Sequence, residues 1–309
     1  MLNMTSLLEP TTQRILLTDW GVLEVRGDDA TTFLQGQLTN DVALMPVGQA
    51  RLSGYCSAKG RLLASFVVLK REANAYHLLM ARDLLAATQK RLQMFVMRAK
   101  CQLQDVSDQW RLTGITGAET LADMPDWACQ AADDGWILRL PSAKVKQAIW
   151  IQPVAAASPA QPSETADGWA FHRALSGVAM VTQATTEHFV PQMINYESVD
   201  GVSFKKGCYP GQEIVARSQF RGAIKRRAAV YTFSDPSQQQ VVEPGMPVFT
   251  AGPDGEECGV VAAAGFLAGQ WALTVSLQTA VADHAVALGA ADGPVMVVQP
   301  LPYRIRDDI

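Results

Sequence analysis

The sequence predicts an α+β fold followed by a separate all-β region at its C-terminal end. Up to Gly117, strand-like runs are interleaved with two helical patterns, which is typical of split βαβ units rather than of a long parallel sheet. After Ala228, short strand-like runs are separated by Gly and Pro turns without a helical pattern, which predicts a sandwich or a barrel. Neither a G-x-G-x-x-G pattern nor a P-loop is present to suggest a nucleotide fold.

The elements of the first half have local signals. Residues 19–27 read as a strand, and Asp28 or Asp29 can cap a helix with apolar positions at helical spacing. The strand-like runs 51–57 and 61–71 are joined by a turn at 58–60. A further strand at 75–81 precedes a helix that begins at Asp83, whose apolar stripe runs from Leu84 to Phe95 and Val96. Strands are also expected at 101–107 and 110–117.

Composition excludes several classes of protein. The chain has 309 residues, enough for two or three domains, and its 48% hydrophobic content excludes a disordered protein. Lys and Arg number 26 against 30 Asp and Glu, a balance that argues against wrapping duplex nucleic acid but allows a local basic patch. Five cysteines without a C-x-x-C pair, and four histidines without ligand spacing, predict no resident metal site and no disulfide framework.

Three segments bear on location and organisation. The N-terminal residues 1–13 carry no secretory signal pattern, so we expect a cytoplasmic protein with no membrane partner. Residues 258–282 are uncharged and long enough to span a bilayer, but their Gly and Gln residues and strand-like alternation predict paired strands. The Pro/Ala/Ser-rich stretch 154–168 is expected to be a surface loop.

The densest chemical signal lies at residues 203–222. Cys208 follows two lysines and Gly207; nearby ammonium groups stabilise a thiolate, and glycine gives the backbone freedom to present the sulfur. Tyr209-Pro210-Gly211 suits a tight turn, and a helix over 212–218 would place the sulfur near a helix N-terminus and pair Glu213 with Arg217. Two interpretations stay open: a reactive or ligand-contacting thiol, or a buried turn with an incidental cysteine.

The motif K-G-C-Y-x-G-Q-E at 206–213 resembles the signature of the YgfZ family of folate-binding proteins, which are relatives of the glycine-cleavage T-protein. Four further blocks resemble the family in its order: 33–42, 56–62, 189–195 and 201–226. The resemblance implies a GcvT-like core over 1–227, formed by two intertwined ferredoxin-type split βαβ subdomains around a central folate site. It also implies a C-terminal β-barrel over 228–309.

The resemblance implies roles for individual residues. Trp20 and Trp169 match the two tryptophans of the family's folate pocket, so tetrahydrofolate or a derivative is the implied cofactor; ordinary core packing is the alternative for each. Cys208 would be the functional thiol and Lys206 would tune it. The remaining motif residues would shape or fix the loop, or contact ligand: Gly207, Tyr209, Gly211, Gln212 and Glu213.

A basic run follows the motif. Five cations fall within 11 residues: Arg217, Arg221, Lys225, Arg226 and Arg227. Such a run could hold a polyglutamate tail, a phosphate backbone or the acidic surface of a partner, or it could be a solvated face.

The sequence also departs from the T-protein pattern. The stretch that matches the T-protein catalytic aspartate has Leu63 and Ala64 and no carboxylate, and Leu175 stands where T-proteins carry a glutamate. Without a base at this point, T-protein-type aminomethyl transfer is not expected.

The resemblance therefore implies a folate-binding accessory protein. It would support the assembly or maintenance of iron–sulfur enzymes and, through methylthiolation, tRNA modification; its partners would be folate and iron–sulfur enzymes or assembly proteins. A cluster would need ligands from a partner, since one cysteine cannot hold it alone. Two alternatives stay open: a folate-dependent one-carbon transferase with a base elsewhere, and a direct tRNA-binding module that uses the basic run.

Overall fold

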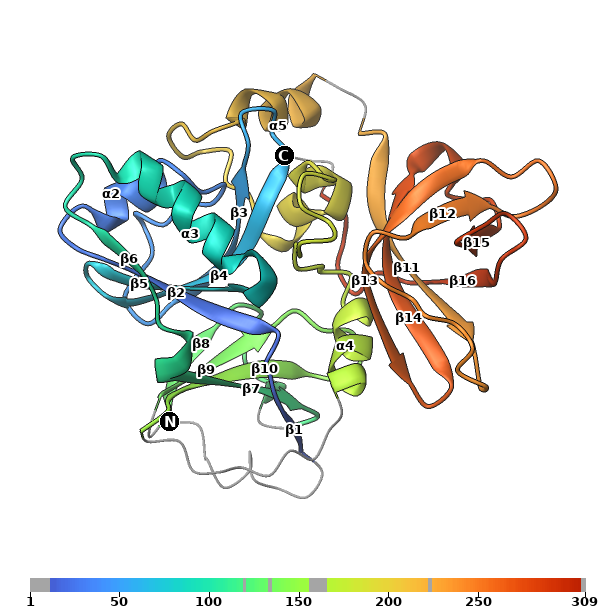
Figure 1. The fold of residues 1–309 in the computed structure, drawn as a ribbon, viewed down its shortest axis with the longest axis horizontal. Helices are drawn as coiled ribbons and strands as arrows, with labels where there is room; N and C mark the ends of the chain where they lie inside the picture. Colours follow the sequence, from blue (N-terminus) through green and yellow to red (C-terminus); the bar gives the residue numbers. More distant parts are fainter. Residues whose placement is uncertain (1–11, 119–120, 133–134, 156–165, 222–223, 307–309) are drawn as a thin grey trace.

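The computed structural model describes residues 12–118, 121–132, 135–155, 166–221 and 224–306. It shows two five-stranded sheets and a closed six-stranded barrel (Figure 1). The α+β expectation and the C-terminal barrel are both confirmed. The first strand of the barrel begins at Arg226, and the division of the chain into domains at 227/228 stays a prediction.

The first sheet is antiparallel and has the order β3-β4-β5-β2-β6. Its strands are β2 (Trp20–Arg26), β3 (Ala50–Cys56), β4 (Leu62–Glu72), β5 (Ala75–Ala81) and β6 (Gln102–Asp105). The helices α2 (Ala30–Gln35) and α3 (Arg82–Val96) pack on one face and bury Phe33, Leu34, Leu84 and Leu92 in a shared core. Phe95, expected on the buried stripe of α3, is instead 46% exposed, since it lies near the end of the helix.

The second sheet has the order β1-β7-β10-β9-β8. Its strands are β1 (Gln13–Leu16), β7 (Trp110–Thr116), β8 (Cys129–Ala132), β9 (Gly135–Leu140) and β10 (Gln147–Pro153). One apolar cluster contains Val22 and Leu79 of the first sheet together with Leu138 and Ile149 of the second. The two sheets therefore share a core, to which β2, β3, β4 and β5 of the first sheet contribute.

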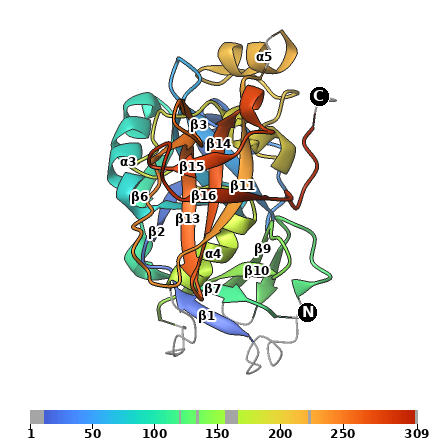
Figure 2. The same ribbon diagram turned by 90° about the vertical axis from the view of Figure 1, so that its right-hand side faces the viewer.

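The barrel is closed in the order β11-β14-β13-β12-β15-β16 and faces the viewer in Figure 2. Its strands are β11 (Arg226–Ser234), β12 (Pro247–Thr250), β13 (Glu257–Leu267), β14 (Gln270–Gln278), β15 (Val286–Leu288) and β16 (Val295–Gln299). The uncharged stretch 258–282 forms the β13–β14 hairpin, as expected. Within the described ranges, no helix is long and apolar enough to cross a membrane.

Short 3-10 helices complete the connections: η1 (Ser107–Gln109), η3 (Pro191–Ile194), η4 (Tyr196–Val199) and η5 (Thr279–Val281). The expected loop at 154–168 lies mostly outside the described residues. Its last three positions are not loop but the first turn of α4 (Ala166–Leu175). That helix lies between the second sheet and the barrel (Figure 1).

Two glycines let α4 approach both of its neighbours closely. A Cβ on Gly265 of β13 would lie 2.1 Å from the backbone N of Phe171, and a Cβ on Gly114 of β7 would lie 2.8 Å from Cε3 of Trp169. Hydrogen bonds fix the same contacts: Thr274 Oγ1 donates to the carbonyl of Ala174 at 2.8 Å. Because a backbone contact cannot be relieved by a rotamer change, the position of α4 is set by glycine in the barrel.

We expect Gly265→Ala to destabilise the protein by about 2–3 kcal/mol, because the new methyl group would clash with the α4 backbone and displace the helix from β13. The measurement is the urea midpoint of unfolding. Gly36→Ala is the matched control: its φ of −83° is ordinary and an added Cβ would meet nothing closer than 3.6 Å. Equal midpoints for the two variants would contradict the close contact between α4 and β13.

Candidate functional site

A cavity of about 180 Å³ lies where the two sheets, α4 and the barrel meet. β3, β4 and β5 supply Leu52, Phe66 and Leu79, and β13 of the barrel supplies Ala262, Ala263 and Ala264. Because three parts of the fold contribute walls, the cavity depends on the placement of α4. We refer to it as the central cavity.

Three tryptophans line the central cavity. Trp20 at the start of β2 and Trp169 on α4 are 9% and 4% exposed and belong to one apolar cluster. Trp127, which precedes β8, is half-buried, and its Nε1 donates to the carbonyl of Val199 at 3.0 Å. The structure thus brings Trp20 and Trp169 together at one cavity. It adds Trp127 as a third aromatic wall, which the sequence did not indicate because the residues around Trp127 match no motif.

The polar groups of the central cavity come from several elements. Arg173 of α4 donates to the carbonyls of Pro141 at 2.8 Å and Val178 at 3.2 Å, and burial lowers its pKa to about 10. The Tyr196 hydroxyl donates to the carbonyl of Ala179 at 2.6 Å. Asp19 lies at the mouth and is exposed to solvent, yet the surrounding protein displaces enough water to raise the pKa of its carboxyl. An apolar hollow with one cation and one carboxylate can hold a flat heterocycle by its faces and its edges.

The positions that depart from the T-protein pattern lie elsewhere. Leu63 lines a hollow against α3, and Ala64 is buried in the core between the first sheet and its helices. Leu175 lines another hollow, between α4 and the barrel. On this stretch of β4 it is the Ser65 hydroxyl that borders the central cavity, where it accepts a hydrogen bond from the Val181 N–H at 2.9 Å.

The motif loop 206–213 lies apart from the central cavity: none of its residues, all of which are described, is in the cavity lining. Lys206 is 8% exposed, and its Nζ donates to the carbonyls of Gln35 at 2.5 Å and Leu38 at 2.7 Å, at the C-terminal end of α2. Burial lowers the pKa of this ammonium to about 8. These hydrogen bonds anchor the loop to α2, a role that the sequence did not indicate, and tuning of the Cys208 thiol by Lys206 stays a prediction.

The other motif residues lie in different surroundings. Cys208 is exposed, so it is not part of a buried turn. Tyr209 is buried, with the Lys206 ammonium 4.9 Å from its ring centroid. In the described structure the side chains of Gln212 and Glu213 make no hydrogen bond, and Glu213 does not pair with Arg217. Among the described residues, these two side chains therefore have no hydrogen bond that would fix the loop, and their contact with a ligand stays a prediction.

Gly211 and Gly207 differ in whether their positions require a glycine. Gly211 has φ +79° and caps α5 (Gln212–Phe220), and a Cβ there would lie 2.4 Å from the carbonyl oxygen of Ser57 and 2.7 Å from Cα of Gly60. Gly207 has no atom within 4 Å of an added Cβ and no positive φ. Only Gly211 needs to be glycine, because it lets the loop sit directly on the β3–β4 turn.

The blocks that are distant in sequence meet around this loop. The Leu62 N–H donates to the carbonyl of Phe189 at 2.8 Å, and the Ser203 N–H donates to that of Thr39 at 3.0 Å. Asn195, in the left-handed conformation with φ +56°, makes paired hydrogen bonds to both backbone groups of Ala228 and so ties the core to β11. The sequence blocks therefore build a platform that presents the loop and holds the barrel.

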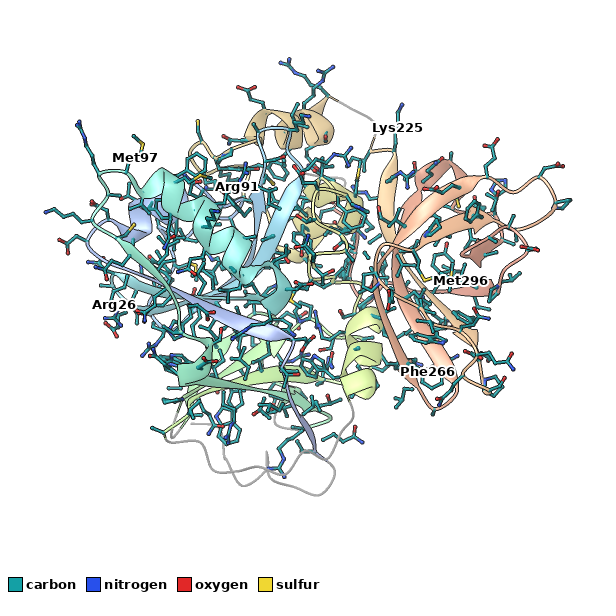
Figure 3. All side chains as sticks on the ribbon, in the orientation of Figure 1. Arg26, Arg91, Met97, Lys225, Phe266 and Met296 are labelled. Carbon is teal, nitrogen blue, oxygen red and sulfur yellow. The ribbon has the colours of Figure 1, made fainter. Side chains whose placement is uncertain are left out.

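The basic run is divided by the structure. Arg217, Arg221 and Lys225 are exposed, and Figure 3 shows Lys225 projecting outward between α5 and the barrel. Arg227 pairs with the fully buried Glu197, and Arg226 donates to the carbonyl of Cys258 at 3.4 Å. The five cations therefore do not form one free patch. Among the described residues, no cluster of His, Cys, Asp and Glu could hold a metal ion.

Comparisons with known proteins agree with this architecture. Residues 17–133 match the family described as the GCVT N-terminal domain. The crystal structure of glycine cleavage system aminomethyltransferase T from Bartonella henselae superposes with a TM-score of 0.66, covering 96% of this chain and 88% of that one at 17% identity. The fold thus defines a GcvT-like protein.

Sequence relatives identify one family within this class of GcvT-like proteins. The tRNA-modifying protein YgfZ of Edwardsiella ictaluri is 30% identical over 68% of this chain and 68% of its own length. The YgfZ protein of Serratia proteamaculans is 28% identical over 95% of this chain and 93% of its own. The chain belongs to the YgfZ family.

We expect Gly211→Ala to destabilise the protein by more than about 2 kcal/mol. An alanine is strained in the left-handed conformation of this residue, and its methyl group would also collide with the backbone of the β3–β4 turn. Gly207→Ala, in the same loop between Lys206 and Cys208, is the matched control and should unfold like the wild type, because an added Cβ meets nothing within 4 Å. Chemical denaturation of both variants provides the measurement. A neutral Gly211→Ala variant would show that the loop does not rest on the β3–β4 turn.

Proposed function

We propose that this protein binds tetrahydrofolate or a derivative in the central cavity and acts as an accessory factor in tRNA modification, by supporting the assembly or maintenance of iron–sulfur enzymes. The observation that carries the folate part is the convergence of Trp20 and Trp169 on one cavity. Both residues also match the two tryptophans of the family's folate pocket. Core packing alone does not require two indoles to border the same hollow.

The shape of the central cavity supports a pterin ring as the bound group. Its volume of about 180 Å³ lies below the roughly 300–1,000 Å³ of pockets that enclose whole drug-sized ligands. A bicyclic ring would fit between apolar and aromatic walls, and the rest of a folate would extend outside. The pterin edge offers adjacent N–H donors that match the Asp19 carboxylate at the mouth, while the cavity-lining Arg173 favours its carbonyl oxygen.

The tRNA-modification part is supported by the YgfZ relatives, which are named tRNA-modifying proteins. Exposure of Cys208 on a rigid loop supports a thiol that meets a partner, since an iron–sulfur cluster needs ligands beyond one cysteine. Direct tRNA binding by the basic run is less supported, because Arg226 and Arg227 are engaged within the protein. Arg217, Arg221 and Lys225 remain for such a contact.

Isothermal titration with tetrahydrofolate under reducing conditions tests the folate part. We expect micromolar binding by the wild type and a loss of about tenfold or more in Trp20→Ala and Trp169→Ala, because each variant removes an aromatic wall. Cys208→Ala should bind normally, because the thiol is outside the cavity. Trp271→Phe, in the barrel, is the matched tryptophan control.

Absence of binding by the wild type would contradict the folate part directly. Equal losses in Trp271→Phe and in the cavity variants would also count against it, because the effect would then follow from general destabilisation. Thermal midpoints of all four variants separate a lost contact from a lost fold.

One observation favours a second candidate function, a folate-dependent one-carbon transferase. Asp19 places a carboxylate at the mouth of the cavity, and desolvation raises its pKa above the usual 3.8, toward the range useful for a general base. The accessory role predicts no turnover of formaldehyde or aminomethyl donors with tetrahydrofolate. The transferase role predicts turnover that falls about 100-fold in Asp19→Asn. Product assays with wild type and variant decide between them.

A further inference from the structure

Trp127 separates the central cavity from a second hollow on the surface. This second hollow, which we call the outer groove, has a volume of about 690 Å³ and is open to solvent. Trp127 borders both spaces, and its half-buried ring is held by the hydrogen bond from Nε1 to the carbonyl of Val199. Its backbone is in the left-handed region at φ +65°.

Two elements run from one space to the other. Along one face of β3, Leu52 borders the central cavity and Ala50 borders the outer groove. Similarly, Tyr196 of η4 borders the central cavity, and Asp200, which directly follows η4, borders the outer groove. The Asn40 Nδ2 donates to the carbonyls of both Leu52 and Asp200, at 2.7 and 2.5 Å, which fixes these two elements together. The outer groove therefore lies directly beside the central cavity, with Trp127 as their common wall.

The charges of the outer groove favour an anion. Its two carboxylates are compensated: Asp126 pairs with Arg139 at 3.5 Å, and Asp200 pairs with Arg306 at 3.2 Å. Arg51 and Lys205 also line the groove, and neither makes an ion pair within the described structure. One Nη of Arg51 donates to the Asp41 carbonyl at 2.7 Å, which orients the guanidinium and leaves its other N–H groups available.

We propose that Arg51 and Lys205 bind the carboxylates of the glutamyl tail of the folate whose ring occupies the central cavity, so that the protein prefers folates with more than one glutamate. This proposal rests on the proposed function. A guanidinium pairs with carboxylates through parallel hydrogen bonds, and a flexible lysine can follow successive carboxylates along a tail. The tail site is thus separate from the basic run at 217–227, for which a polyglutamate tail was one of several possible occupants.

Titration with three ligands tests this assignment: tetrahydropteroate, which lacks glutamate, tetrahydrofolate, and tetrahydrofolate triglutamate. The wild type should bind the triglutamate about tenfold more tightly than tetrahydropteroate, and 0.5 M salt should reduce that ratio. In Arg51→Gln and in Lys205→Gln the ratio should fall to about threefold, and in the double variant toward one, with tetrahydropteroate binding unchanged. Lys90→Gln, on α3, is the matched control and should keep the wild-type ratio.

The outcomes separate the two proposals. If the wild type binds none of the three ligands, the proposed folate function fails. If it binds all three equally, folate binding stands and the tail site is overturned. If the variants weaken all three ligands in the same proportion, Arg51 and Lys205 act through the structure, and the tail site is again overturned. Because Lys205 is exposed, Lys205→Gln keeps the test valid even if Arg51→Gln fails to fold.

Discussion

The close approach of α4 to a barrel strand is the constraint on which the rest of the structure depends. Gly265 of β13 lets the α4 backbone contact the barrel, and Gly114 of β7 lets the Trp169 ring lie against the second sheet. The same helix turns Arg173 toward the central cavity, while Ala262–Ala264 of β13 form the opposite wall. Barrel, helix and sheet therefore assemble the cavity together, and none of them encloses it alone.

A second consequence is that the family motif and the cavity are separate parts of one scaffold. Lys206 and Gly211 hold the motif loop on α2 and on the β3–β4 turn, and Cys208 is presented to solvent. A direct reaction between a ligand in the cavity and the Cys208 thiol is not supported by this arrangement. A partner that reaches the thiol from outside is compatible with it, since both the loop and α5 lie at one end of the molecule (Figure 1).

Local patterns were sufficient to predict β2, the β3–β4 hairpin, β5, α3 and the β13–β14 hairpin, because each has a strong period and clear turn residues. They were insufficient for β1, β8 and β15, which are three or four residues long and carry too little periodicity. Trp20 and Trp169 could be singled out only through the family resemblance. Their proximity to each other and to Trp127 is tertiary and leaves no local signal, whereas Arg173 follows Trp169 by one turn of α4.

The roles of charged residues were the least predictable. Arg227 looked like a free surface cation, but its partner Glu197 lies 30 positions earlier and is fully buried. Lys206 was linked in sequence only to its neighbour Cys208, and the structure adds hydrogen bonds from its ammonium to carbonyls about 170 positions earlier. Spacing along the chain reports neighbours in sequence, whereas the pairing of a buried charge depends on the chain that folds over it.

A crystal structure of the protein with bound tetrahydrofolate tests the central claim most directly. Our account predicts the bicyclic ring in the central cavity, bordered by Trp20, Trp127 and Trp169, with the benzoyl-glutamate portion leaving past Trp127. A folate ring bound against the Cys208 loop, or in the hollow beside α3, would contradict the account.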